Sequence, residues 1–204
     1  MGKVSIAVLA SGRGSNFKSI LSEIHAGRCN AIVNVLITNN PDAPAIEIAT
    51  QNNVPVEILE PKNFSSREDF DDKIKETLDK YDVELVVLAG YMLILKGKKL
   101  LDSYQIINIH PALLPSFPGV DAQNQAFDHG VKISGVTVHF VDAGLDSGPI
   151  IYQEAVDISN CKTTEETAEK ILKIEHLAYA KVIDLFSKGK YVIEGRRVKF
   201  LKNE

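Results

Sequence analysis

The chain has 204 residues, of which 45% are hydrophobic and 25% charged, and its formal net charge is -4. This composition excludes global disorder, and the scattered lysines and arginines exclude a broad basic surface for nucleic acid. Two cysteines are too few for a disulfide framework, and no apolar run approaches the ~20 residues of a membrane helix. We therefore expect a single cytoplasmic domain over residues 1–204, a monomer or homodimer that contacts neither nucleic acid nor membrane.

The first half of the chain alternates between apolar runs and amphipathic segments. In chain order we predict a strand at Val4 to Leu9, a helix at Asn16 to about His25, a strand at Ala31 to Thr38, a helix at Ala43 to Asn52, a strand at Val56 to Leu59, a helix at Ser66 to Tyr81 and a strand at Leu85 to Ala89. Such alternation predicts a Rossmann-like α/β fold, in which helices flank both faces of a mostly parallel, twisted sheet.

The second half of the chain is less regular. It begins with a short apolar segment and continues through loops, strands and a long helix to a terminal hairpin. We predict the apolar segment Tyr91 to Leu95, a lysine-rich turn, a strand at Ile106 to Ile109, a shaped loop at Pro111 to Gly119, a helix at Asp121 to His129, a strand at Ile133 to Phe140, a polar loop at Asp142 to Pro149, a strand at Ile150 to Val156, a helix at about Thr164 to Ser187 and a hairpin at Tyr191 to Phe200 with Glu194-Gly195 at its turn.

A glycine-rich loop lies between the first strand and the first helix, with the sequence Gly12-Arg13-Gly14-Ser15-Asn16. Glycine lets the backbone approach a ligand closely, and the free N–H groups at the positive end of a helix bind phosphate. The spacing fits neither G-x-G-x-x-G nor the P-loop with its lysine, which disfavours a dinucleotide or ATP. A phosphate site is one interpretation, and a tight turn with Ser15 or Asn16 as the N-cap is the other.

Two polar residues end a central apolar strand. Asn108 and His110 are two positions apart, so both side chains point to the same face of the sheet. Ligands of open α/β sheets bind at the carboxyl ends of the strands, where the glycine-rich loop also lies. A catalytic histidine in this crevice and a satisfied structural histidine are both compatible with the pattern.

Asp142 and Asp146 occur in a polar loop after the strand that carries Thr137 and His139. Turns use aspartate and glycine often, so the loop is compatible with ordinary turn chemistry as well as with a catalytic carboxylate. A carboxylate that faced His110 would raise the pKa of the histidine and fix its orientation. His25, His129 and His139 have no partner that the sequence identifies, and we expect them to be structural or surface residues.

Several segments resemble the phosphoribosylglycinamide formyltransferases, a family of folate-dependent formyltransferases. They follow the family's order over nearly the whole chain and comprise Gly14-Ser15-Asn16, residues 89–95, residues 108–119, residues 135–142 and residues 145–151. The block from Asn108 to Pro115 is shared by the wider family and indicates the chemistry, whereas the Gly-Ser-Asn loop indicates the acceptor. The resemblance implies formyl transfer from the co-substrate 10-formyltetrahydrofolate to the amine of N1-(5-phosphoribosyl)glycinamide (glycinamide ribonucleotide) in de novo purine biosynthesis.

The resemblance also implies a role for individual residues, and it implies no metal. The catalytic residues would be Asn108, His110 and Asp146. The acceptor would be bound by Gly14, Ser15, Asn16 and Glu175. The folate would be bound by Arg67, Met92, Leu93, Ile94, Leu95, Asn108, Asp142 and Asp146, and Thr137 would lie near the active centre.

Many family members have an arginine where this chain has Leu93 and a histidine where it has Asp121. The first departure removes a side-chain contact to the folate. The second could change the pH dependence of the activity or the ordering of the loop from Pro111 to Gly119, called the proline loop below. Neither concerns the expected catalytic residues, among which we expect Asp146 to hold His110 protonated while His110 and Asn108 donate to the formyl oxygen.

Other functions remain open at this stage. They are formylation of methionyl-tRNA, formylation of a sugar nucleotide, hydrolysis of formyl-folate, and a binding module without turnover. We expect an enzyme that formylates methionyl-tRNA and one that hydrolyses formyl-folate to bring further domains. This chain starts at its first strand and ends soon after its long helix. The presence of Asn108, His110 and Asp146 together disfavours the binding module.

Overall fold

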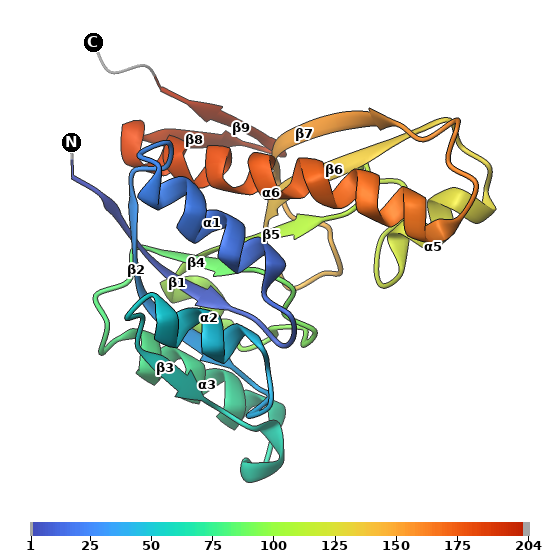
Figure 1. The fold of residues 1–204 in the computed structure, drawn as a ribbon. Helices are drawn as coiled ribbons and strands as arrows, with labels where there is room; N and C mark the ends of the chain where they lie inside the picture. Colours follow the sequence, from blue (N-terminus) through green and yellow to red (C-terminus); the bar gives the residue numbers. More distant parts are fainter. Residues whose placement is uncertain (1, 202–204) are drawn as a thin grey trace.

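A nine-stranded sheet with helices on both faces forms the described part of the protein, in the strand order β3-β2-β1-β4-β5-β6-β7-β9-β8 (Figure 1). The structure is a computed structural model that describes residues 2–201, so residue 1 and residues 202–204 of the predicted domain lie outside the described residues. Five of the strand pairs are parallel and three are antiparallel. The mostly parallel α/β architecture predicted from the sequence is therefore confirmed.

The strands begin and end close to the predicted positions because the apolar runs that define them are buried. They are β1 (Val4–Leu9), β2 (Ala31–Thr38), β3 (Val56–Ile58), β4 (Leu85–Leu88), β5 (Gln105–His110), β6 (Ile133–Phe140), β7 (Ile150–Asp157), β8 (Tyr191–Glu194) and β9 (Arg197–Phe200). Side chains alternate across the sheet with a period of two. In β1, Ile6 and Val8 pack into the core on one face, and Ala7 and Leu9 pack into the core on the other.

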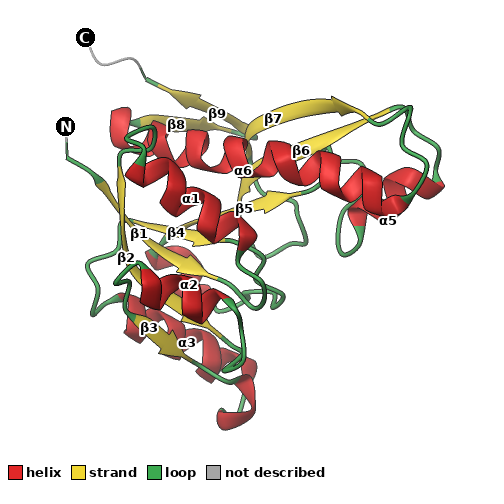
Figure 2. Cartoon of the chain, in the orientation of Figure 1, coloured by secondary structure: helices red, strands yellow, loops and turns green. Residues whose placement is uncertain are grey.

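The helices divide between the two faces of the sheet (Figure 2). They are α1 (Ser15–His25), α2 (Ala45–Gln51), α3 (Arg67–Leu78), α4 (Lys98–Ser103), α5 (Ala122–Asp128) and α6 (Thr164–Lys188), with a 3-10 turn at Pro61–Asn63. Buried residues of α1, α2 and α6 share one core, and buried residues of α3 and α4 share the other. Figure 1 shows α1 and α6 side by side on their face.

Two predicted details of the second half are wrong. The lysine-rich turn after Leu95 leads into helix α4, because Leu100 is fully buried and anchors the segment against the sheet. The turn of the terminal hairpin consists of Gly195 and Arg196 instead of Glu194 and Gly195. Glu194 pairs with Arg197 in the ladder, so the reversal falls one residue later.

The antiparallel pairing of β5 with β6 places polar residues opposite one another at the end of the parallel part of the sheet. His139 lies opposite Asn108, and Thr137 lies opposite His110. The carboxyl ends of β1, β4 and β5 meet at the same edge, where ligands of open α/β sheets bind. The register therefore concentrates the sequence-predicted polar residues at this edge.

Within residues 2–201, no helix has both the length and the apolar character that a membrane span requires.

The buried hydroxyl of Tyr179 joins α6 to the sheet. It contacts the carbonyl oxygens of Leu88 at 2.9 Å and Ile107 at 3.0 Å, next to Asn108. We expect Tyr179→Phe to lower the free energy of unfolding by about 1–2 kcal/mol, because both carbonyls lose their shared donor. Urea denaturation measures this change. Tyr104→Phe, which removes an exposed hydroxyl bonded to Asp79, should cost less than about 0.5 kcal/mol, and equal losses would contradict the prediction.

Candidate active site

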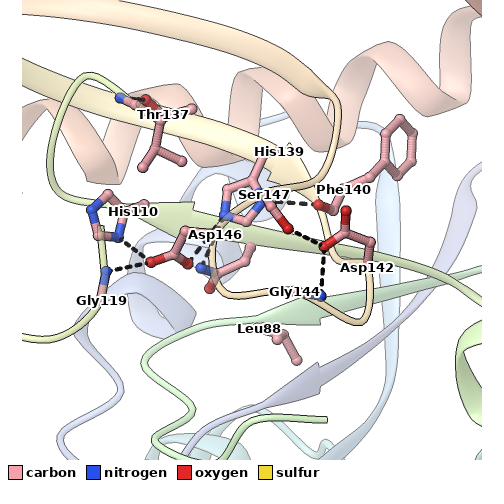
Figure 3. Close-up of polar contacts among 12 residues, drawn as sticks. Leu88, His110, Gly119, Thr137, His139, Phe140, Asp142, Gly144, Asp146 and Ser147 are labelled. Atoms are coloured by element: carbon pink, nitrogen blue, oxygen red, sulfur yellow. Dashed lines mark hydrogen bonds and ion pairs between the residues drawn. The ribbon is translucent and has the colours of Figure 1, made fainter. Parts of the chain in front are cut away.

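His110 lies at the carboxyl end of β5 and contacts two groups from later loops, of which Figure 3 shows the Asp146 carboxylate. Its ring is almost fully buried, with 3% of the residue exposed. Nδ1 lies 3.4 Å from Oδ2 of Asp146, and Nε2 lies 2.7 Å from the carbonyl oxygen of Phe117. Because a carbonyl oxygen only accepts hydrogen bonds, Nε2 carries a hydrogen. The carboxylate that the sequence suggested as a partner of His110 does face it.

Asp146 is held from several sides. The Gly119 backbone N–H donates to Oδ2 at 2.7 Å, and Oδ1 lies 3.6 Å from Nε2 of His139. Asp146 adopts a positive φ of 49°, a conformation that costs of order 1 kcal/mol or more in a residue other than glycine. The surrounding contacts keep the carboxylate between two imidazole rings in spite of this cost.

The balance of burial and charge lowers the pKa of both His110 and Asp146. Burial lowers the pKa of His110 below its usual range, and the Phe117 carbonyl and the Asp146 charge only partly oppose this. Burial would raise the pKa of the Asp146 carboxyl, but the contacts from His139 and the Gly119 amide outweigh it and lower the pKa. The Asp146 charge favours the protonated ring, as the sequence analysis expected, but desolvation of the ring is the largest contribution to the pKa of His110 and acts in the opposite direction.

His139 belongs to this cluster, contrary to the expectation that it is a structural or surface residue without a partner. Its Nδ1 donates to the Phe140 carbonyl at 2.8 Å, so its Nε2 can accept from the Asn108 amide, whose Nδ2 lies at 3.4 Å. These contacts orient the Asn108 amide. The sequence pattern could have identified His139 as a candidate site residue, because Thr137 and His139 share one face of an apolar strand in the same way as Asn108 and His110.

Thr137 shapes the proline loop next to His110. Its hydroxyl donates to the Ala112 carbonyl at 2.7 Å and accepts from the Leu114 N–H at 3.0 Å and from Nε2 of Gln153 at 2.9 Å. Its hydrogen-bonding capacity is thus used within the protein. Thr137 lies opposite His110 in the ladder, and its side chain contacts the loop backbone there.

The glycine-rich loop leads directly into α1. Gly14 adopts a φ of 69°, and a Cβ added to it would lie 2.9 Å from the Cβ of Ala45, so both conformation and packing require glycine. Gly14 itself is the N-cap and α1 begins at Ser15 without a side-chain cap, so Ser15 and Asn16 are not N-caps as one interpretation held. The first N–H groups of a helix have no partner within it and are available to a ligand.

Asn16 and Glu175 connect this loop with α6. Nδ2 of Asn16 donates to Oε2 of Glu175 at 2.8 Å, and Glu175 is 6% exposed. Burial raises the pKa of the Glu175 carboxyl, and the hydrogen bond from Asn16 lowers it only in part. Two residues that the sequence assigned to the acceptor are thus in direct contact, although they are 159 positions apart.

The segment Met92 to Leu95 runs beside Arg67, as expected for two parts of one site. Nη2 of Arg67 donates to the Ile94 carbonyl at 2.5 Å. The Met92 N–H donates to the hydroxyl of Ser11, which itself donates to Asn39. Ser11, which the sequence analysis did not single out, therefore joins the glycine-rich loop to this segment. Leu93 and Leu95 lie in the same segment as Met92 and Ile94, and the Leu95 side chain is buried against the sheet.

Asp142 and Asp121 do not reach His110 through any contact that the structure records. Oδ1 of Asp142 accepts from the Gly144 N–H at 3.0 Å and from the Ser147 hydroxyl at 2.7 Å, so it folds the loop that presents Asp146. Asp121 is the N-cap of α5 with a φ of 65° and makes no side-chain cap bond. Within residues 2–201, no group of His, Cys, Asp and Glu side chains is arranged to hold a metal ion.

Comparison with known proteins gives matches over nearly the whole chain. Residues 4–183 match the family described as formyl transferase. Phosphoribosylglycinamide formyltransferase of Bacillus subtilis (strain 168) is 45% identical over 179 residues, which cover 87% of this chain and 91% of that protein. The crystal structure of glycinamide ribonucleotide transformylase 1 from Symbiobacterium toebii is 45% identical with a TM-score of 0.94, covering 98% of this chain and 95% of that chain.

A longer protein also matches. The trifunctional purine biosynthetic protein adenosine-3 of Gallus gallus is 35% identical over 190 residues, which cover 92% of this chain. This chain spans only 19% of that protein, so the likeness concerns one part of it.

The protonation of His110 can be tested by following its ring nitrogens with NMR as the pH changes. We expect a pKa below the ordinary histidine value, and a further decrease in Asp146→Asn, because the lost negative charge had favoured the protonated ring. Asp157→Asn, the same change at the far end of β7, should leave the titration unchanged. A pKa above the ordinary value, or one that rises in Asp146→Asn, would contradict the prediction.

Proposed function

Because the chain belongs to the formyl transferase family, we propose that it transfers a formyl group from 10-formyltetrahydrofolate to the amine of N1-(5-phosphoribosyl)glycinamide. The product is the N-formyl compound of de novo purine biosynthesis. The observation that carries the proposal is that His110, at the carboxyl end of β5, lies 3.4 Å from Asp146, while Asn108 on the same strand contacts His139, the other ring beside Asp146. The protein is a one-carbon transferase, and its family uses a formyl-folate co-substrate.

The acceptor phosphate fits the start of α1. Gly14 allows the backbone to come close, and the N–H groups of Ser15 and Asn16 lie at the positive end of the helix. Glu175, held by Asn16, offers its second carboxyl oxygen to polar groups of the acceptor. This arrangement would bind the phosphate at one end and direct the amine toward His110.

The folate fits the other side of the crevice. The side chains of Met92 and Ile94 are exposed apolar groups, 73% and 49% exposed, and offer contact to an aromatic ring. Arg67 supplies a positive charge for a folate carboxylate, and backbone groups from Met92 to Leu95 and from the loop of Asp142 and Asp146 supply polar contacts. Leu93 contributes its backbone to this set, in place of the arginine side chain of many relatives.

The proposed chemistry is direct transfer. The acceptor amine attacks the formyl carbon, the tetrahedral species collapses, the bond to the folate nitrogen breaks, and the proton lost by the amine is balanced by the proton gained by that nitrogen. Negative charge develops on the formyl oxygen, where the amide of Asn108 and the Nε2–H of His110 donate. Asp146 accepts the amine proton, directly or through water. This mechanism uses no metal ion.

The lowered pKa of His110 is compatible with this role. Nε2 already carries a hydrogen and donates it to the Phe117 carbonyl, so the ring is a donor without being charged. To reach the formyl oxygen, His110 has to exchange the Phe117 carbonyl for the substrate. The loop that contains Phe117 therefore has to shift during the catalytic cycle.

The reaction is tested by following the folate product spectrophotometrically with and without the acceptor. We expect product only when both 10-formyltetrahydrofolate and N1-(5-phosphoribosyl)glycinamide are present. Equal rates without the acceptor would identify a formyl-folate hydrolase instead. Absence of product in both cases, followed by product with another amine, would identify another folate-dependent formyl transfer.

The roles of the proposed catalytic residues are tested by single substitutions. We expect His110→Ala and Asp146→Asn each to reduce kcat by about 10²–10³-fold, because a donor to the developing oxyanion, or the acceptor of the amine proton, is lost. His25→Ala, at the exposed end of α1, is the matched histidine control and should retain full turnover. Near-normal turnover in either site variant would exclude the role assigned to that residue.

A further inference from the structure

Asp71 is a fully buried carboxylate on α3, with 0% of the residue exposed. It lies outside the group formed by Asn108, His110 and Asp146, and the proposed chemistry does not use it. A buried carboxylate is costly unless hydrogen bonds and an opposite charge compensate it. Its contacts therefore indicate what the carboxylate stabilises.

One oxygen of Asp71 holds the backbone that follows the Met92–Leu95 segment. Oδ2 accepts from the Lys96 N–H at 2.8 Å and from the Gly97 N–H at 2.7 Å. The fit is close, because a Cβ added to Gly97 would lie 2.6 Å from the Cβ of Asp71. Two charge-assisted hydrogen bonds to successive amides thus fix the end of the segment against α3.

The other oxygen of Asp71 faces Arg67, one helical turn earlier on α3. Nε of Arg67 lies 3.5 Å from Oδ1, while its Nη2 donates to the Ile94 carbonyl. The guanidinium also lies over the ring of Phe70, with 5.0 Å between its central carbon and the ring centroid. Asp71 therefore constrains the segment through its backbone at one end and through Arg67 in its middle.

The Arg67 side chain keeps capacity for a ligand. It is 35% exposed, and Oδ1 of Asp71 makes no hydrogen bond of its own. The Tyr91 hydroxyl is likewise buried without a hydrogen-bond partner, and the charges of Arg67 and Asp71 both act on it. An arginine backed by a buried carboxylate is oriented before a ligand carboxylate arrives, which reduces the entropy lost on binding.

We propose that Asp71 is a positioning residue for the folate carrier, which sets both the Arg67 guanidinium and the Met92–Leu95 backbone in their binding geometry. The inference rests on the proposed function, because these two elements are its folate side. It predicts that loss of the Asp71 charge weakens binding of the folate and leaves the acceptor side, around Gly14 and Glu175, unaffected.

Asp71→Asn tests the proposal, because it keeps the shape of the side chain and removes the charge. We expect KM for 10-formyltetrahydrofolate, and the calorimetric Kd for an unreactive deaza-folate, to rise about tenfold. KM for the acceptor and kcat at saturating folate should stay within about twofold of the wild-type values. If Asp71 were needed only for stability, Asp71→Asn would lower the melting temperature without raising KM for the folate more than KM for the acceptor.

Asp72→Asn is the matched control, since it makes the same change at the next residue of α3. Asp72 pairs with the Lys99 ammonium at the surface at 2.5 Å and makes no contact with Lys96 or Gly97 that the structure records. Its Kd for the deaza-folate should equal the wild-type value. If the Kd of Asp72→Asn for the deaza-folate rose as much as that of Asp71→Asn, the proposal would be overturned. Any loss of charge on α3 would then weaken folate binding.

Gly97→Ala keeps the proposal testable if Asp71→Asn does not fold. Gly97 has a φ of -63°, which alanine adopts readily, so the main conflict is with the Asp71 side chain. We expect the same weaker folate binding at unchanged acceptor KM. An unchanged Kd for the deaza-folate in this variant, or a loss confined to kcat or to the acceptor, would overturn the proposal.

The proposed function and this inference fail in different ways. A wild-type protein that binds the deaza-folate but forms no product would overturn the reaction, and the binding comparison between Asp71→Asn and Asp72→Asn would still decide the role of Asp71. A wild-type protein that does not bind the deaza-folate would overturn the role of Asp71 as well.

Discussion

The Asp146 carboxylate lies between the rings of His110 and His139, and much of the surrounding structure holds it there. The Gly119 N–H donates to the carboxylate, which offsets part of the cost of placing a charge in a largely buried position. The backbone conformation at Asp146 is itself unfavourable, so the contacts of Asp142 within the same loop are needed to maintain it. The rings in turn depend on the antiparallel register of β5 and β6.

The same physical arrangement, a carboxylate that accepts hydrogen bonds from another segment of the chain, recurs at three places around the site. Asp146 accepts from the loop at Gly119, Asp71 accepts from the segment after Leu95, and Glu175 accepts from Asn16 at the start of α1. Each carboxylate comes from a different element. Such bonds are directional, and they are strong where the carboxylate is charged. They give each loop a defined position, which a catalytic site that works by orientation requires.

The electrostatics of the site follow from desolvation more than from the nearest charge. His110 has a carboxylate close to Nδ1, yet burial lowers its pKa, and the ring is a donor through Nε2. In the proposed reaction, Nε2–H donates to the negative charge that develops on the formyl oxygen, and Asp146 accepts the proton that the attacking amine loses. The arrangement therefore stabilises charge that develops during a reaction instead of carrying a full charge beforehand.

The sequence by itself determined the alternation of strands and helices, the glycine-rich loop and the polar end of β5, because burial periodicity and backbone conformation are local properties. It also indicated the family through ordered motifs. The role of His139 was decided only by tertiary structure, since its contact with Asn108 joins residues 31 positions apart through strand register. The lowered pKa of His110 and the contacts of Asp71 were likewise decided by packing, because desolvation and buried partners exist only once the chain has folded.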